Sequence, residues 1–335
     1  MSALPEVCAA VLLLALVVYA ISGGADFGGG VWDLLAGGPR KREQRELIAH
    51  AIGPIWEANH VWLIFAIVIL FTAFPPAFSA VCIALHVPLT LALIGIVLRG
   101  SAYVFRAYGD PAHAARWGVV FAVSSLVTPL VLGAAIGALA AGLELEDGFP
   151  AAGLWGTWLA PFPLLVGLLS VSGFAFLAAV YLWREGVGAL AEDFRRRAGI
   201  AQGAAVALAL GGLLLAPAEL RAGLWGAGWV LAATALACGV TVFALVRGHP
   251  SLARLGAAAQ VAGVVAGWGV AQAPELVPGS LTIREAVAPP ETLALTAVVL
   301  GVGALILIPS FYALLRLFKS DAPERPPADT NPEAA

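Results

Sequence analysis

Charged residues are scarce in this chain. Of its 335 residues, 12% are Asp, Glu, Lys or Arg, whereas 61% are hydrophobic. A soluble globular domain typically carries about 25% charged residues. This shortage of charge excludes a soluble domain and predicts a protein that crosses a membrane several times. Segments of about ten residues with alternating hydrophobicity are also missing, so the pattern favours helical spans over a β-barrel.

Cysteine is equally scarce and shows no ligand spacing. Cys8, Cys82 and Cys238 are the only three, with neither C-x-x-C nor C-x-x-C-H spacing among them. This argues against covalent haem attachment and cysteine-bound metal, and small packing residues are the simpler interpretation. We therefore expect the chain to bind no metal.

Long apolar windows, by contrast, are abundant. A membrane-spanning helix needs about 20 consecutive apolar residues, and the sequence offers nine such windows. The start MSALPEVCAAVLLL has neither a basic n-region nor an A-x-A cleavage site, so we expect the first window to be a retained span. The predicted spans cover residues 6–24, 53–74, 77–98, 117–142, 156–182, 199–217, 224–246, 255–272 and 292–315.

These windows predict an all-α integral membrane protein with nine transmembrane helices. We expect one polytopic membrane domain over 1–319, in which spans 1–4 (6–142) and spans 5–8 (156–272) form two four-helix bundles and the ninth helix (292–315) is peripheral. The segments SGGADFGGGVW, from residue 22, and SGFAFLAAVYLW, from residue 172, end the first helix of each half and suggest an internal repeat. Residues 320–335 are polar and Pro-rich, which predicts a disordered tail.

The basic residues are segregated between the loops. All of the 18 Lys and Arg residues except Arg221 and Arg284 follow odd-numbered spans and so lie on one side of the membrane. Positive residues are retained on the cytoplasmic side. We therefore expect the amino terminus outside and the carboxyl terminus in the cytoplasm. On the outer side, the prolines of 273–291 favour a folded cap or turn over a helix.

Ionisable residues within the spans are confined to the first half. Spans 5–9 contain only hydroxyl and amide groups, whereas Asp26, Glu57, His60 and His86 lie in or at the ends of spans 1–3. An ionisable group in hydrocarbon is costly unless it is paired or hydrated, so its presence points to function. His86 stands alone, and a hydrogen-bonded contact between helices is its simplest interpretation.

The stretch GPIWEANHVW collects polar and aromatic groups on one helix surface. Glu57 and His60 are three residues apart, and Trp56 is three residues from Asn59 and four from His60, the spacing of neighbours on a helix. Such a cluster should face protein or water and not lipid.

Asp26 and Arg99 are expected at the depth of this cluster, since they end spans 1 and 3 on the cytoplasmic side. Two interpretations stay open. Asp26 and Glu57 can be structural partners of Arg99, or they can relay protons from cytoplasmic water with His60 alongside. Glycines 28–30 remove side-chain bulk next to Asp26, which lets backbone or water approach closely.

Several of these stretches resemble one known family. GGADFGGGVWDLL, GPIWEANHVWLIFAIVILFTAFP, LRGSAYVFR and WGVAQAPELVPGSLTIREAVAPPETL, which begin at residues 23, 53, 98 and 268, are similar to subunit II of the cytochrome bd-type quinol oxidases. The resemblance covers essentially the whole chain, although 107–250 match in hydrophobic layout only.

The resemblance implies a part in aerobic respiration. Such complexes oxidise quinol, reduce dioxygen to water and take the consumed protons from the cytoplasm. Their haems, of b and d type, belong to subunit I, while subunit II packs against it and binds no haem. The implied location is the bacterial cytoplasmic (inner) membrane. The implied partners are a haem-bearing subunit I, membrane lipid and the quinol substrate of the complex. The resemblance also allows a small accessory subunit and implies no binding of nucleic acid.

The resemblance also assigns roles to individual positions. Asp26 and Glu57 match acidic positions that line a proton route toward the haem sites, and His60 ranks below them. Trp56 and Arg99 match positions near which a structural quinone sits in some members. Glu57 is Asp in many relatives, so its longer side chain keeps the carboxylate but changes its reach. Asn59 is expected to support the cluster.

Two other classes of function are compatible with the residues alone. A secondary transporter also contains repeats, but it places its site between the halves and uses polar groups from both. The lack of ionisable groups in spans 5–9 counts against that class. A purely structural membrane assembly subunit would use the same acids for packing only.

Overall fold

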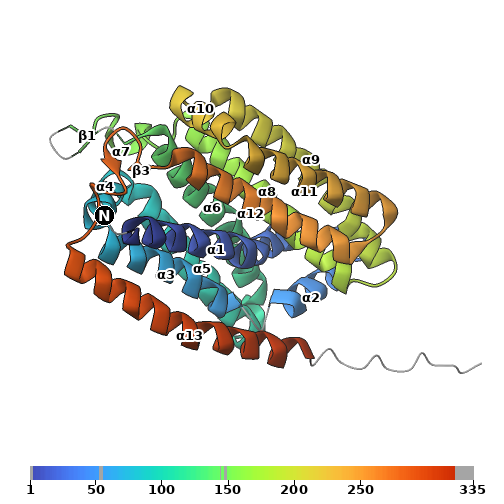
Figure 1. Cartoon of the computed structure of the whole chain (residues 1–335). Helices are drawn as coiled ribbons and strands as arrows, with labels where there is room; N and C mark the ends of the chain where they lie inside the picture. Colours follow the sequence, from blue (N-terminus) through green and yellow to red (C-terminus); the bar gives the residue numbers. More distant parts are fainter. Residues whose placement is uncertain (1–2, 53–55, 144, 147–148, 321–335) are drawn as a thin grey trace, which may run out of the picture. The chain divides into compact units, whose positions relative to one another are not determined.

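The computed structural model describes residues 3–52, 56–143, 145–146 and 149–320, and within these ranges it leaves the side chains of 52, 56–58, 111, 145–146 and 314–320 undescribed. Helix dominates the described chain, as the long apolar windows predict (Figure 1). The tail predicted to be disordered lies, from residue 321 on, outside the described residues.

Eight helices among the described residues are long and apolar enough to cross a membrane. A ninth span results if α3 (Trp56–Ala73) and α4 (Pro75–Ala84) count as one, although the axes of 59–73 and 75–84 differ by 118°. The eight are α1 (Leu4–Leu34), α5 (His86–Tyr108), α6 (Ala114–Ala141), α8 (Pro161–Glu185), α9 (Ala189–Leu215), α11 (Gly228–Arg247), α12 (Pro250–Gln272) and α13 (Pro290–Ser320).

Short elements join the long helices. They are α2 (Lys41–Ile52), η1 (Pro111–His113), β1 (Leu145–Glu146), β2 (Phe149–Pro150), α7 (Gly153–Gly156), α10 (Ala218–Gly226), β3 (Glu275–Val277) and β4 (Leu281–Thr282). β1 pairs with β2 and β3 with β4, both antiparallel. The Ala288 N–H donates to the Ala73 carbonyl at the end of α3 (2.9 Å). The folded cap predicted for 273–291 is therefore confirmed.

The third predicted span, 77–98, is wrong in its position. Proline has no N–H and restricts the residue before it, so α3 ends at Ala73 and a new helix begins at Pro75. That helix, α4, is short, and α5 occupies 86–108 instead. The apolar residues continue through the break, which is why a hydropathy window alone cannot locate it.

This shift moves two residues that the sequence singles out. His86 opens α5 and is exposed, with its Nδ1 2.9 Å from the Ile83 carbonyl oxygen, so it is not a deeply placed group. Arg99 lies within α5 and not at the end of a span. In the same way α1 continues to Leu34, so Asp26 lies inside a helix that was expected to stop at residue 24.

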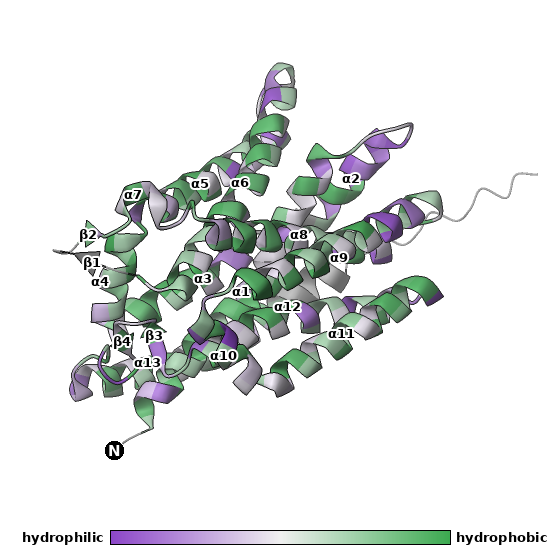
Figure 2. Cartoon of the chain, turned by 90° about the horizontal axis from the view of Figure 1, so that it is seen from above, coloured by the Kyte–Doolittle hydropathy of each residue, from purple (hydrophilic) through white to green (hydrophobic). Residues whose placement is uncertain are grey.

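In the described part of the chain, α1 and α8 each pack against more long helices than any other helix does. α1 packs against α3, α6, α8 and α12, and α8 packs against α1, α6, α9 and α12. Six consecutive residues of α8, 175–180, are at most 5% exposed, so protein encloses this helix on every side. Hydrophobic residues cover the long helices, while hydrophilic residues gather on α2 and near helix ends (Figure 2).

The crossing of α1 and α8 joins the two segments that suggested a repeat. A Cβ atom on Gly28 would overlap the backbone carbonyl of Phe174, so only glycine allows this approach. The Trp32 Nε1–H donates to the Ala175 carbonyl (2.7 Å). The rings of Phe27 and Phe174 stack with their centroids 6.4 Å apart. The Gly-rich run beside Asp26 therefore serves helix packing at Gly28.

Candidate functional site

Three buried polar side chains from three helices lie near one another, and two of them, Asp26 and Asn59, are hydrogen-bonded. Asp26 from α1 is 8% exposed, Asn59 from α3 is 4% exposed and Arg99 from α5 is 1% exposed. The Asn59 Nδ2–H donates to Asp26 Oδ2 (2.5 Å). These three residues are called the inner cluster below. They are among the polar residues that the sequence predicts at one depth of the membrane.

Arg99 is held by a hydroxyl and two aromatic rings. Its Nε–H donates to Ser125 Oγ (3.1 Å), and the Ser125 hydroxyl donates to the Phe121 carbonyl one turn earlier on α6 (2.7 Å). The guanidinium carbon lies 4.9 Å from the Phe27 ring centroid and 5.2 Å from that of Phe121. A cation over the face of an aromatic ring is attracted by its quadrupole. Arg99 is thus a fixed positive charge near Asp26.

Several polar atoms around the inner cluster can form further hydrogen bonds. In the described part of the chain, Arg99 Nη2, the Tyr19 hydroxyl and the Thr128 hydroxyl are buried without a hydrogen-bond partner. Buried groups of this kind are normally satisfied by ordered water. The interior beside Asp26 therefore has the chemistry to hold water.

His60 joins the inner cluster through ring contacts. Its imidazole lies edge-on to the Tyr19 ring, with centroids 6.0 Å apart, and 5.9 Å from the Phe27 ring. Trp56 and Glu57 begin α3, one turn before Asn59 and His60. The side chains of Trp56 and Glu57 lie outside the described part of the structure, so their predicted roles stay predictions.

A second charged layer was not predicted from the sequence. Asp33, with a side chain 2% exposed, accepts two hydrogen bonds from Arg106 (3.0 and 3.1 Å), and Arg45 Nε lies 3.7 Å from its carboxylate. Asp33 and Arg106 follow Asp26 and Arg99 by seven residues each, which is two helical turns, or about 10 Å along a helix. This matched spacing was the signal that could have revealed the layer.

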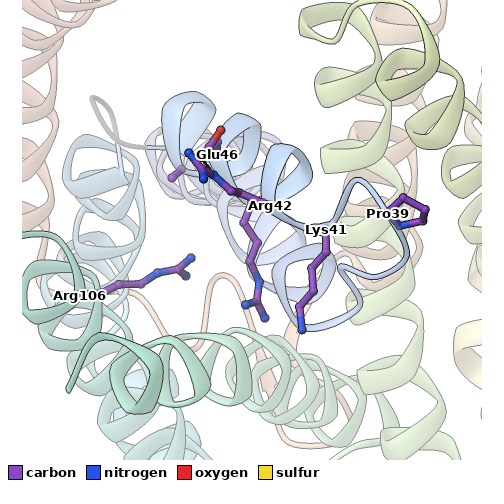
Figure 3. Close-up of a pocket in the computed structure, with 7 residues that line it drawn as sticks. Pro39, Lys41, Arg42, Glu46 and Arg106 are labelled. Atoms are coloured by element: carbon purple, nitrogen blue, oxygen red, sulfur yellow. Dashed lines mark hydrogen bonds and ion pairs between the residues drawn. The ribbon is translucent and has the colours of Figure 1, made fainter. Parts of the chain in front are cut away.

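Two cavities open beside Asp33 and its arginine partners. One, of about 410 Å³, is lined by Asp33, Arg45 and Arg106 and by residues 114–122 of α6. The other, of about 490 Å³, lies between α2 and α5 and shares Arg45 and Arg106 (Figure 3). The Asp33 layer is therefore next to open space, while the inner cluster is enclosed.

We expect Asp33→Asn to lower the free energy of unfolding by about 1–3 kcal/mol, because two arginines lose their shared buried carboxylate. The loss should stay below that of a fully buried pair, since the Arg106 and Arg45 side chains are 27% and 40% exposed and can be hydrated. Thermal unfolding of the purified protein measures this. The control Glu46→Gln removes an ion pair that is exposed on both sides, Arg42–Glu46, and should change stability by less than about 1 kcal/mol. Equal effects of the two changes would contradict the assignment of Asp33.

The described residues offer no built haem or metal site. No three His, Cys, Asp or Glu side chains among them lie close enough to hold a metal ion. His86 is exposed and bonded locally, and His60 lies against the Tyr19 and Phe27 rings.

Comparisons with known proteins give a consistent result. The family model described as "Cytochrome bd terminal oxidase subunit II" matches residues 4–318. Subunit 2 of the Escherichia coli (strain K12) cytochrome bd-I ubiquinol oxidase is 31% identical over 193 residues, which cover 56% of this chain and 50% of that protein. Subunit 2 of the Bacillus subtilis (strain 168) cytochrome bd ubiquinol oxidase is 31% identical over 124 residues, 37% of this chain and 36% of that protein. The chain thus spans half or less of the length of these curated relatives.

A solved structure extends the similarity over nearly the whole chain. A chain of the bd oxidase from Geobacillus thermodenitrificans superposes with a TM-score of 0.82 at 26% identity, covering 96% of this chain and 100% of that one. The structural similarity therefore extends over most of residues 107–250, where the sequence resemblance is limited to hydrophobic layout.

Proposed function

The chain belongs to the cytochrome bd terminal oxidase subunit II family, and on this premise we propose that it serves a quinol oxidase of the bacterial cytoplasmic membrane. The complex would transfer electrons from a quinol to dioxygen and form quinone and water. In this proposal the chain binds a haem-bearing subunit I, stabilises it and helps to conduct cytoplasmic protons to the oxygen-reduction site. The family match over 4–318 is the observation that carries the proposal.

The proton role rests on the enclosure of Asp26. A carboxylate inside a membrane protein is costly, so Asp26 needs the hydrogen bond from Asn59 and the nearby positive charge of Arg99. A carboxyl group can take up a proton at one oxygen and release it to a neighbour, which the amide of Asn59 cannot do. Asp26 is therefore the proposed proton carrier of the inner cluster, with Glu57 and His60 alongside.

The proposed route begins at the cavity next to Asp33. Basic residues of α2 and the neighbouring loop mark this end as cytoplasmic by the positive-inside rule. Asp33 and Asp26 are two helical turns apart on α1, about 10 Å, which is too far for direct transfer. Protons must therefore pass through water between the two layers. The buried hydroxyls of Tyr19 and Thr128 lie on the other side of the inner cluster, where they can extend the path beyond Asp26.

The haems of the complex are proposed to lie in subunit I, where they would supply the electron transfer to dioxygen. A structural quinone remains a proposal for the surroundings of Trp56 and Arg99. Because Arg99 is 1% exposed, a quinone headgroup would have to enter the protein to meet its guanidinium group.

Purification of the chain together with the proteins bound to it tests this function. We expect a haem-bearing partner to co-purify, the visible spectrum of the complex to show b- and d-type haems, and the complex to consume oxygen when quinol is added. Isolation of the chain as a haem-free, self-sufficient ion exchanger would contradict the proposal and favour a secondary transporter. A third outcome is that a haem-bearing partner co-purifies and needs this chain for stability, but substitutions in the inner cluster leave turnover unchanged. The chain would then have only the role of stabilising its partner.

A further inference from the structure

The cavity of about 490 Å³ between α2 and α5 is lined by basic side chains (Figure 3). Lys41, Arg42 and Arg45 come from α2, and Arg106 comes from α5. Figure 3 shows Lys41 and Arg42 extending from α2, and Arg106 from α5, into the same space. Side chains from two helices that are far apart in the sequence thus converge on one cavity.

This cavity carries an excess of positive charge. In the described part of the chain, two carboxylates lie within ion-pair distance of any of its four cations. Glu46 is 2.7 Å from Arg42 Nε, and Asp33 binds Arg106 and Arg45. Four cations against two carboxylates leave two positive charges for a ligand. Arg40 does not contribute, because Asp193 accepts two hydrogen bonds from it (2.8 and 2.6 Å).

Aromatic residues beside Arg106 indicate that the cavity lies at the depth of lipid headgroups. The rings of Phe105 and Trp117 stack with their centroids 4.7 Å apart, and Tyr108 is 85% exposed. Trp and Tyr side chains concentrate at the membrane–water interface. Phe105 is itself 48% exposed and offers an apolar surface next to the cationic cavity. A ligand with an anionic head and an apolar body fits both features.

We propose that this cavity binds the phosphate of an anionic phospholipid headgroup. Guanidinium groups bind phosphate oxygens in pairs, and an ammonium group adds a point charge. Basic pockets at the cytoplasmic ends of membrane helices are suited to anionic headgroups. Lys41 and the Nη groups of Arg42, of which only Nε is bonded to Glu46, would hold the phosphate oxygens. Arg106, already bonded to Asp33, would add its charge from the opposite side of the cavity, and the acyl chains would lie along the exposed face of α5 near Phe105.

The test compares two pairs of charge-neutralising changes in the purified complex. Lys41→Gln with Arg42→Gln removes two cations of the cavity. Arg116→Gln with Arg196→Gln removes two exposed cations that line neither cavity. After removal of bound lipid, each complex is titrated with phosphatidylglycerol, phosphatidylcholine or inorganic phosphate, and the bound molecules are counted by native mass spectrometry.

We expect the cavity variant to bind its tightest phosphatidylglycerol about 30-fold more weakly than the unchanged complex, because each of the two basic residues contributes about fivefold at the surface. The control pair should stay within about twofold, and phosphatidylcholine should bind weakly to all three. Both pairs change exposed side chains, so thermal unfolding should be unaltered. Equal phosphatidylglycerol binding by the cavity variant and the unchanged complex would overturn the proposal. It would also be overturned if inorganic phosphate bound as tightly as the lipid, or if the control pair weakened binding equally.

Discussion

Replacing Asp26 with Asn is expected to lower quinol-driven oxygen consumption roughly tenfold or more per assembled complex. Asn has nearly the same shape as Asp and can still accept a hydrogen bond from Asn59, but it cannot take up and release a proton at neutral pH. Because position 26 is 8% exposed, bulk water cannot replace the lost carrier. An oxygen electrode with saturating quinol gives the rate, and the haem absorbance of each sample gives the amount of complex.

The change at Asp26 also removes a negative charge near Arg99, which can lower the yield of assembled complex. Expressing the rate per haem therefore separates assembly from turnover. Asp193→Asn is the matched control. It makes the same chemical change in a carboxylate that is hydrogen-bonded to Arg40 and Gln44, outside the proposed route. Its turnover per haem should stay within about twofold of the unchanged complex. Full turnover and proton uptake by a stably assembled Asp26→Asn complex would remove Asp26 from the route.

The second large effect is expected from Gly28→Ala, which should lower the free energy of unfolding by about 3 kcal/mol. The added methyl group would meet the backbone carbonyl of Phe174, and backbone cannot move aside as a flexible side chain can. α1 and α8 would have to separate, and the hydrogen bond from Trp32 to Ala175 would be weakened with them. Thermal unfolding and the yield of assembled complex measure the loss.

Gly173→Ala provides the control for this change. Gly173 lies on the facing helix next to Phe174, but a Cβ atom there would meet no atom within 4 Å. Alanine is the better helix former by up to about 1 kcal/mol, so this variant should be as stable as the unchanged protein or slightly more so. If both variants unfolded alike, the close approach at Gly28 would not be the cause of instability.

The sequence could predict the parts of the site that depend on local chemistry. Asp26 and Asn59 are polar residues inside apolar stretches, and such residues must find partners in the protein interior. Their hydrogen bond therefore agrees with the expectation that the cluster faces protein. The motifs around these residues also identified the family, which the match over 4–318 confirms.

The burial of Arg99 could not be predicted, because it depends on where a helix breaks within a continuous apolar run. The prolines after Phe74 end α3, and the short helix α4 moves α5 to 86–108. Arg99 then lies well inside its helix, against Ser125 and two aromatic rings. A hydropathy window averages over about 20 residues and does not resolve such a break.

The composition of the chain by itself determined that it is a helical membrane protein, since apolar length and scarcity of charge are properties of each segment alone. Only the tertiary structure decided that Asp33 pairs with Arg106 and that Gly28 meets Phe174, residues 73 and 146 positions apart. Which distant residues meet depends on how helices pack, and packing follows from the shapes of all side chains together and not from the hydropathy of any one stretch.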